Sequence, residues 1–246
     1  MKAILTFHSI DDSGSVLSYP PSLFAQLLEN LHNANLSVVN LDTILAPTTQ
    51  HGVTLTFDDG MRSVYNNALP ILRDHAAPAH IFITTNAVGT EQQWPKQPSD
   101  VPSFDMLSWD NIEQLHQSGV AIDAHTHPDM RKLSTEQMAA ECEQANDEIE
   151  RRIGRRPEFF AYPFGYHNKQ ARDYSRKLYT GSVTTELRSL SHQEDHAALP
   201  RLDSYYLQSP WLLNNLSSPL TKGYIQLRWL LRTLRGSHCT ANYDDQ

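Results

Sequence analysis

The stretch Val53-Thr54-Leu55-Thr56-Phe57-Asp58-Asp59-Gly60 decides how this chain folds. A run of apolar and β-branched residues leads to two adjacent carboxylates and stops at a glycine, a pattern that predicts a buried strand ending in a turn. Two adjacent carboxylates resist joint ionisation unless a cation lies beside one of them. We therefore expect Asp58 and Asp59 at the rim of a sheet, next to a metal ion.

Composition limits the kind of protein that this turn belongs to. The 246 residues carry a net charge of −8, which gives no basic field for nucleic acid, so we expect no nucleic-acid partner. Cys142 and Cys239 are the only cysteines and make no disulfide framework. The N-terminus turns polar after a few apolar residues, and no long apolar run follows. We expect a cytoplasmic location.

Strand-like and helix-like segments alternate along the chain, which predicts a mainly parallel sheet with helical crossovers. The expected strands cover residues 3–7, 36–39, 53–57, 79–84, 120–124, 158–162 and 182–185. The expected helices cover residues 22–31 with Ser22 as N-cap, then 65–75, 109–117, 134–153 and 168–178. Residues 89–105 are polar and Pro-rich, and we expect a long loop there that overhangs a site.

Chemistry-bearing residues follow several of these strands. Because the carboxyl ends of parallel strands emerge at one edge, Asp58, Asp59, His125 and His127 should converge there, together with His8. Side chains two residues apart on a strand stand about 6.5 to 7 Å apart, a span that two imidazoles can close onto one ion. Paired histidines also cap strands, but a neighbouring Asp-Asp turn favours a metal site with open positions for water and substrate.

Three motifs carry a resemblance to a known family. Thr56-Phe57-Asp58-Asp59-Gly60 matches the first motif of polysaccharide deacetylases of the NodB-homology class, carbohydrate esterase family four. His125-Thr126-His127-Pro128 matches both ends of the second motif but lacks two residues between the histidines. Tyr162-Pro163-Phe164-Gly165 matches the third, with Ala161 where many members have arginine. The likeness covers about residues 1–207.

The resemblance implies a fold and an activity. The fold is a distorted (β/α)7-type barrel, a single domain over residues 1–207, with a C-terminal helical extension over residues 208–246. The activity is that of a metal-dependent de-N-acetylase, a hydrolase of amide bonds that releases acetate from a sugar. The implied substrate is an N-acetylated sugar of a polysaccharide or glycan intermediate, including lipid-linked saccharides.

The resemblance also implies roles for single residues. Asp59, His125 and His127 would hold one divalent metal, usually Zn²⁺, while a set of two imidazoles and one carboxylate also accepts Co²⁺, Ni²⁺ or Mn²⁺. Asp58 would be the general base, and His8 would protonate the departing amine, with His167, His192 and His196 as weaker candidates. The substrate-binding candidates, which comprise the oxyanion-binding loop and an aromatic side chain that stacks on sugar rings, are Pro163, Phe164, Gly165, Tyr166 and Trp94.

Departures from the family motifs leave alternatives open. The shortened spacing displaces one imidazole unless the turn is rebuilt, and Asp123 could replace the first histidine because Asp123, His125 and His127 share a strand face. Ala161 removes a cation that would tune Asp58, and Arg62 or Arg201 could substitute for it.

Two rival functional classes remain beside the deacetylase. Residues 123–127 also resemble the D-x-H-x-H strand of amidohydrolases and metal-dependent phosphoesterases. A non-catalytic carbohydrate-binding descendant is the second rival, because the histidine spacing is shortened and Ala161 replaces arginine.

The C-terminal forty residues lie outside the motifs. Within residues 220–235 an apolar helical stripe contains Tyr224, Leu227, Leu230, Leu231 and Leu234, and another face contains Arg228, Arg232 and Arg235. The favoured interpretation is a helix packed on the barrel with its arginine face in solvent. The alternative is peripheral contact with the inner face of a membrane.

Overall fold

The computed structural model describes residues 1–91, 102–216 and 218–234. One parallel sheet of seven strands, in the order β8-β7-β6-β5-β4-β1-β9, forms its centre. Its strands are β1 (Lys2–Phe7), β4 (Gly52–Phe57), β5 (His80–Thr84), β6 (Ala121–His125), β7 (Phe159–Ala161), β8 (Gly181–Val183) and β9 (Leu202–Asp203). Two short strands, β2 (Ser9–Ile10) and β3 (Ser18–Tyr19), pair separately.

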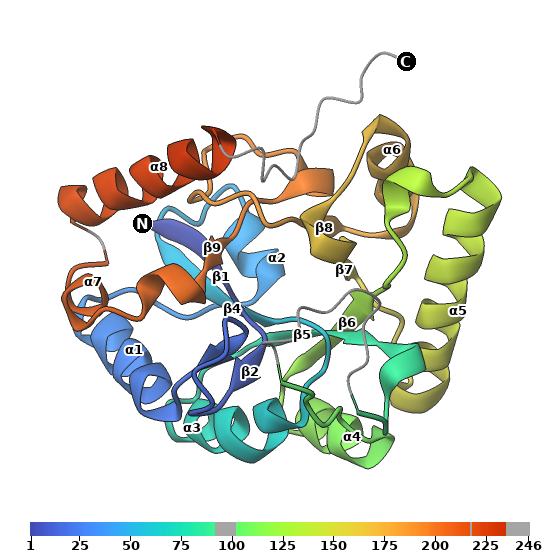
Figure 1. The fold of residues 1–246 in the computed structure, drawn as a ribbon, viewed down its shortest axis with the longest axis horizontal. Coiled ribbons are helices and arrows are strands. Elements are labelled where there is room, and N and C mark those ends of the chain that lie inside the picture. Colours follow the sequence, from blue (N-terminus) through green and yellow to red (C-terminus); the bar gives the residue numbers. More distant parts are fainter. Residues whose placement is uncertain (92–101, 217, 235–246) are drawn as a thin grey trace.

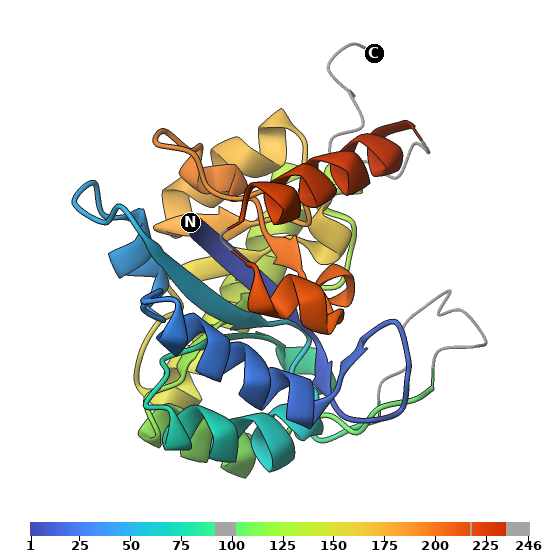
Figure 2. The same ribbon diagram turned by 90° about the vertical axis from the view of Figure 1, so that its left-hand side faces the viewer.

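Helices surround the curled sheet (Figures 1 and 2). They are α1 (Pro21–Asn33), α2 (Leu41–Leu45), α3 (Leu69–Asp74), α4 (Trp109–Gln117), α5 (Thr135–Ile153), α6 (Lys169–Leu178), α7 (Pro210–Asn214) and α8 (Pro219–Leu234). The alternation of parallel strands with helices confirms the predicted distorted α/β barrel, with a helical C-terminal part. The division into domains at residue 207 stays a prediction.

The two faces of the sheet carry two separate apolar cores. Side chains such as Leu5, Leu55 and Ile81 pack outward against the helices, whereas Ile4, Phe82 and others pack inside the curl. Neighbouring residues belong to different cores because successive side chains of a strand point to opposite faces. The polar residues at the carboxyl ends of the strands therefore lie at one rim of the curled sheet, next to the inner core.

A short segment joins the two edges of the curled sheet. Leu199 donates its N–H to the Ser182 carbonyl at 2.8 Å and accepts the N–H of Thr184 at 2.8 Å, next to β8. Three residues later, Leu202 pairs with Leu5 of β1, at the opposite edge. Residues 199–203 thus close the barrel, and their inward-facing positions point at the inside of the sheet.

Several expected elements differ from the observed ones for local reasons. Residues 36–39 form only an isolated bridge at Val38, so the strand expected there is wrong. Helix α1 begins at Pro21 with Pro20 as N-cap, so Ser22 is not the cap. The helix expected over residues 65–75 begins as a π turn, Val64–Ala68, before α3. Pro70 lacks the N–H that a regular α-helix needs there.

Candidate active site

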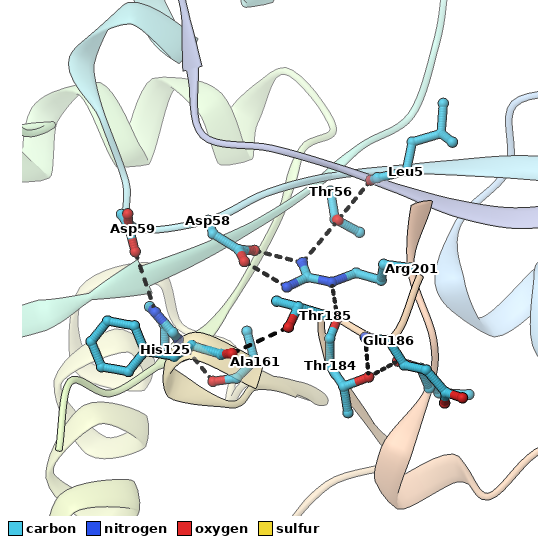
Figure 3. Close-up of polar contacts among 12 residues, drawn as sticks. Leu5, Thr56, Asp58, Asp59, His125, Ala161, Thr184, Thr185, Glu186 and Arg201 are labelled. Carbon is cyan, nitrogen blue, oxygen red and sulfur yellow. Dashed lines mark hydrogen bonds and ion pairs between the residues drawn. The ribbon is translucent and has the colours of Figure 1, made fainter. Parts of the chain in front are cut away.

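The rim of the sheet gathers the residues that follow four strands. His8 follows β1, Asp58 and Asp59 follow β4, His125 ends β6, and the turn at residues 163–166 follows β7. In-register pairing of β1 with β4 brings His8 beside Asp58, whose N–H donates to the Phe7 carbonyl at 2.9 Å. The predicted convergence is therefore present in the fold, and Figure 3 shows its centre.

Asp58 and Asp59 face different partners because the backbone turns sharply between them. Asp59 has a φ of 70°, and Gly60 continues with 89°, so the chain is left-handed at both positions. The Gly60 N–H donates to the Asp58 carbonyl at 2.9 Å, which closes the turn. Both carboxylates are buried, yet each lies beside a different cationic or basic group.

Asp58 pairs with Arg201, the central residue of the closing segment. The two terminal nitrogens of Arg201 donate to Oδ1 and Oδ2 of Asp58 at 2.7 and 2.6 Å, a bidentate geometry (Figure 3). Nε of Arg201 donates to the Thr184 carbonyl at 2.8 Å, and Nη1 also reaches Thr56 Oγ1 at 3.2 Å. Burial raises the pKa of Asp58, but the charge and hydrogen bonds of Arg201 outweigh it, and the pKa lies below its usual value.

Arg201 thus supplies the guanidinium that Ala161 cannot. Of the two arginines considered as substitutes, Arg62 pairs instead with Asp105 at 3.0 Å, on the surface. The alternative ligand Asp123 is also committed elsewhere: its Oδ2 lies 2.7 Å from His80 Nδ1, and its Oδ1 accepts the Phe159 N–H at 3.1 Å. Asp123 is therefore part of a buried network inside the barrel.

Asp59 contacts His125, and the geometry of this pair fits a metal ligand set. Nδ1 of His125 lies 2.8 Å from the Ala161 carbonyl, an acceptor, so Nδ1 carries a hydrogen. Nε2 then faces Asp59 Oδ1 at 3.3 Å. A neutral imidazole would bring two acceptors together there, so the pair needs a cation between them. Two ligands about 2.0 to 2.2 Å from a tetrahedral zinc ion stand about 3.3 Å apart.

Protonation equilibria agree with a cation at this position. Burial lowers the pKa of His125, but its hydrogen bond to Asp59 and the nearby carboxylate charges raise it overall. Burial raises the pKa of Asp59, and the hydrogen bond from His125 with the charges of His8 and the two rim histidines lowers it. Both shifts favour a positive charge between Asp59 and His125, where a divalent ion could take the place of a proton.

His127 lies beside His125 at the rim. Its ring centre is 6.4 Å from that of His125, and it packs edge-on to Phe164 at 5.7 Å. Burial and the neighbouring His125 lower the pKa of His127 to about 4, so it is neutral and can offer a lone pair. Over the residues that the structure describes, no three His, Cys, Asp or Glu side chains form a ready metal cluster. The three-ligand set stays a prediction, with two ligands in contact.

The other histidine candidates lie in different surroundings from His8. The charge of His8 lowers the pKa values of both Asp58 and Asp59, which places this half-buried ring near both carboxylates. His167 is buried against Tyr162 and has its pKa lowered to about 4, mainly by burial. His192 and His196 are exposed on the segment before the closing strand. These surroundings favour His8 over the other three histidines as a group that acts beside the two carboxylates.

The turn after β7 leaves one backbone donor unused by its own hydrogen bonds. Gly165 donates its N–H to the Tyr162 carbonyl at 2.8 Å and Tyr166 donates to the Pro163 carbonyl at 3.0 Å. Pro163 has no N–H, so Phe164 carries the donor that the turn itself does not use. Phe164 has a φ of 56°, and its side chain is 57% exposed beside His127. Tyr166 lies under Arg131, 4.1 Å from its guanidinium carbon.

A cavity of about 580 Å³ opens beside the two histidines. Its walls include Thr84, His125, His127, Glu91 and Glu141. Thr84 Oγ1 is buried and has no hydrogen-bond partner in the described part of the chain, so it can bind a ligand in the cavity. Trp94, the predicted stacking residue, lies outside the described residues.

Sequence reasoning missed two contributors to this site. The Ala161 carbonyl fixes the orientation of His125. A contact made by a backbone atom does not depend on the residue type and cannot be seen in the sequence. Thr84 ends β5 in register with His125, and a threonine in a strand carries no functional signal of its own.

Comparisons with known proteins agree with this architecture. Residues 46–181 match the family described as polysaccharide deacetylase. YxkH of Bacillus subtilis (strain 168) is 25% identical over 208 residues, which cover 81% of this chain and 70% of YxkH. A poly-beta-1,6-N-acetyl-D-glucosamine N-deacetylase of Staphylococcus aureus (strain MRSA252) is 25% identical over 170 residues, 64% of this chain. The match spans 53%, about half, of that enzyme's length.

Solved structures share the fold. The Streptococcus pyogenes deacetylase PplD, in complex with acetate, has a TM-score of 0.70 at 23% identity and covers 82% of this chain and 91% of its own. IcaB from Ammonifex degensii has a TM-score of 0.70 at 22% identity, with 91% and 96% covered. The family match covers more than half of the chain and contains both aspartates and both histidines of the rim, so the chain belongs to the polysaccharide deacetylase family.

Proposed function

We propose that this rim hydrolyses the N-acetyl group of a sugar in a polysaccharide or glycan intermediate and releases acetate, with one divalent metal. The division of labour between Asp58 and Asp59 carries the proposal. Asp58 is held ionised by Arg201, while Asp59 faces His125 across a gap that suits a cation. Family membership supports the reaction class, hydrolysis of an amide bond.

Asp59, His125 and His127 would hold the metal, with Zn²⁺ as first choice and Co²⁺, Ni²⁺ or Mn²⁺ compatible with the same donors. When bound, such an ion supplies a Lewis acid for the acetamide oxygen and makes a water molecule more acidic. His127 must approach by a side-chain adjustment, which its half-buried position beyond the end of β6 allows. The ring of His125 needs no adjustment, since Ala161 already orients it.

Asp58 would act as general base and His8 as general acid. Asp58 removes a proton from the attacking water, whose oxygen bonds to the acetyl carbon. The Phe164 N–H would stabilise the negative charge that develops on the acetyl oxygen. His8 donates a proton to the amide nitrogen as the C–N bond breaks, which yields acetate and a free amine. Arg201 acts through Asp58, since it keeps this carboxylate ionised and aligned.

The cavity beside the histidines is the proposed site for the sugar. It is lined by hydroxyl, amide and carboxylate groups suited to sugar hydroxyls, including Thr84, Asn86 and Gln144. We propose a substrate of the class that the staphylococcal relative's name describes, a polymer of N-acetylated hexosamine, and we extend it to lipid-linked saccharides. The cytoplasmic location remains a proposal as well.

The rival functions have less support from the geometry. A phosphoesterase of the D-x-H-x-H type uses its aspartate as a ligand, whereas Asp123 is committed to His80 and to backbone N–H groups. A non-catalytic descendant was suggested by the loss of arginine at position 161, but Arg201 now provides a buried guanidinium for Asp58. The deacetylase therefore remains the better account.

Acetate release tests the proposal. Purified chain should release acetate from N-acetylhexosamine oligomers or lipid-linked sugars, lose this activity on chelation, and regain it on addition of zinc. Metal analysis before and after chelation should follow the activity at about one ion per chain. Release of phosphate from phosphoesters without acetate from any N-acetyl sugar would favour the rival enzyme class. Failure to bind metal after reloading would favour the binding descendant.

A further inference from the structure

Helix α8 turns its leucines away from the protein. Thr221 and Ile225 are buried against the body of the molecule, while Leu220, Leu227, Leu230, Leu231 and Leu234 are between 36% and 74% exposed. At about 100° per residue, these leucines fall within an arc of about 100° on the far side of the helix. The helix therefore packs on the body, as the favoured interpretation from sequence expects, but its outer face carries the leucines and not the arginines.

Exposed apolar side chains gather in this one segment. Of ten large hydrophobic side chains that the described residues expose, eight lie between Tyr205 and Leu234. Of the other two, Phe164 belongs to the active-site rim and Val16 lies alone near β3. Scattered exposed leucines are ordinary, but a continuous helical stripe is typical of a surface that contacts an apolar phase.

Charge is segregated in the same segment. Residues 204–243 contain four Lys or Arg and no Asp or Glu, in a chain whose net charge is −8. Over the described residues, Lys222, Arg228 and Arg232 form no ion pair. Arg228 stacks on Tyr206 at 4.5 Å, Lys222 is exposed, and Arg232 Nη1 is buried against the body without a hydrogen-bond partner in the described residues. Their charge is thus not neutralised by carboxylates of the described residues.

We propose that α8 lies on an anionic membrane surface, with its leucine face in the acyl boundary and its cations near lipid phosphates. A helix with a leucine stripe, a tryptophan and only positive charges has the composition of an interfacial helix. None of the helices in the described ranges has the length and hydrophobicity to cross a bilayer, so the contact is peripheral. A second copy is a poorer occupant, since two such helices would bring only like charges together.

Vesicle co-sedimentation of the full chain tests this proposal. Vesicles of phosphatidylcholine are compared with vesicles that contain about one third phosphatidylglycerol. The test variant, Leu227→Ser/Leu230→Ser/Leu234→Ser, changes exposed side chains and should leave the fold and the hydrolysis of a water-soluble substrate unchanged. Val16→Ser, an equally exposed apolar position outside the segment, is the matched control. A second variant, Lys222→Gln, removes an exposed cation of the helix.

The wild type and Val16→Ser should partition to the anionic vesicles and not to the neutral ones. The triple leucine variant should bind at least about tenfold more weakly, and the charge variant about fivefold more weakly. Equal partitioning of the wild type and the leucine variant would overturn the proposal, as would a wild type that does not bind. Self-association that the leucine variant abolishes, without vesicle binding, would instead assign the face to a second copy.

Discussion

At the scale of single residues, Arg201 explains how this chain can do without the arginine expected at position 161. Its side chain is fully enclosed, and three of its nitrogens are used, two of them on Asp58. A buried charge without a partner is costly, so each member of this pair requires the other. The sequence offered Arg201 only as one of two options, because the contact depends on how residues 199–203 close the barrel.

Arg201→Lys should move the acidic limb of the pH–rate profile to higher pH. Arg201 lowers the pKa of Asp58, and lysine keeps the charge but loses the bidentate hydrogen bonds. The base is then protonated at higher pH, and activity falls most at the acidic end. Arg62→Lys, at an exposed arginine that also pairs with an aspartate, is the control. An acidic limb that stays in place in Arg201→Lys would exclude this role.

At the scale of elements, the turn after β7 depends on Gly165. Its φ of 73° is left-handed, and an added Cβ would collide with the backbone and side chain of Thr185. Any relief of that collision moves Phe164, whose N–H is the proposed oxyanion donor. The carbonyl of Phe164 also accepts the Thr185 hydroxyl at 3.2 Å, so both ends of the turn would shift.

Gly165→Ala should therefore lower kcat by about 10- to 100-fold, since a displacement of about 1 Å can cost that much. Gly154→Ala is the matched control, because Gly154 also has a left-handed φ, 76°, but an added Cβ meets nothing within 4 Å. The control should lose about 1 kcal/mol of stability and keep its activity. Equal kcat in both variants would argue against the proposed donor.

Elements with local signals were predictable, and elements defined by distant contacts were not. Ser108 and Ser134 both form capping boxes, and α4 and α5 begin at Trp109 and Thr135, within one residue of the expected helix starts. Strand β9 has two residues, too few for any periodicity, and its pairing partner Leu5 lies at the other end of the domain. The same limit applies to α8, because an amphipathic pattern does not say which face meets the body.

At the scale of the whole molecule, the active-site rim lies at the carboxyl ends of a parallel sheet, as the alternation of elements predicts. The aspartates and His125 sit there because strand ends in such a sheet share one edge. His127 does not complete the ligand set in the same way, because it lies beyond the end of β6, where the sheet no longer fixes the backbone. The shortened histidine spacing is thus where sequence reasoning reaches its limit.

Global stability should fall as the pH drops from 7 to 5, in part through His167. Burial lowers its pKa from 6.5 to about 4 in the folded state. Below pH 6.5 the His167 imidazole therefore binds a proton in the unfolded chain but stays neutral in the folded chain. The free energy of unfolding falls over this range. For this group, linkage gives about 2 kcal/mol between pH 7 and pH 5.

Urea denaturation of wild type and His167→Phe at both pH values measures this contribution. His167 is 4% exposed, and its Nδ1 has no hydrogen-bond partner in the described part of the chain. Phenylalanine at this position therefore costs no hydrogen bond of Nδ1. The variant should lose less stability than the wild type on acidification, whereas His192→Phe, at an exposed histidine, should behave as the wild type. An identical loss in all three proteins would mean that His167 titrates normally.

The most direct test of the central claim compares Asp58→Asn with the wild type in one preparation that measures both bound metal and acetate release. Asparagine keeps the shape of the side chain but cannot accept the proton from water. We expect Asp58→Asn still to bind about one metal ion per chain and to release acetate about 100- to 10,000-fold more slowly than the wild type. Acetate release at the wild-type rate by the metal-loaded Asp58→Asn variant would contradict the role of Asp58 as general base.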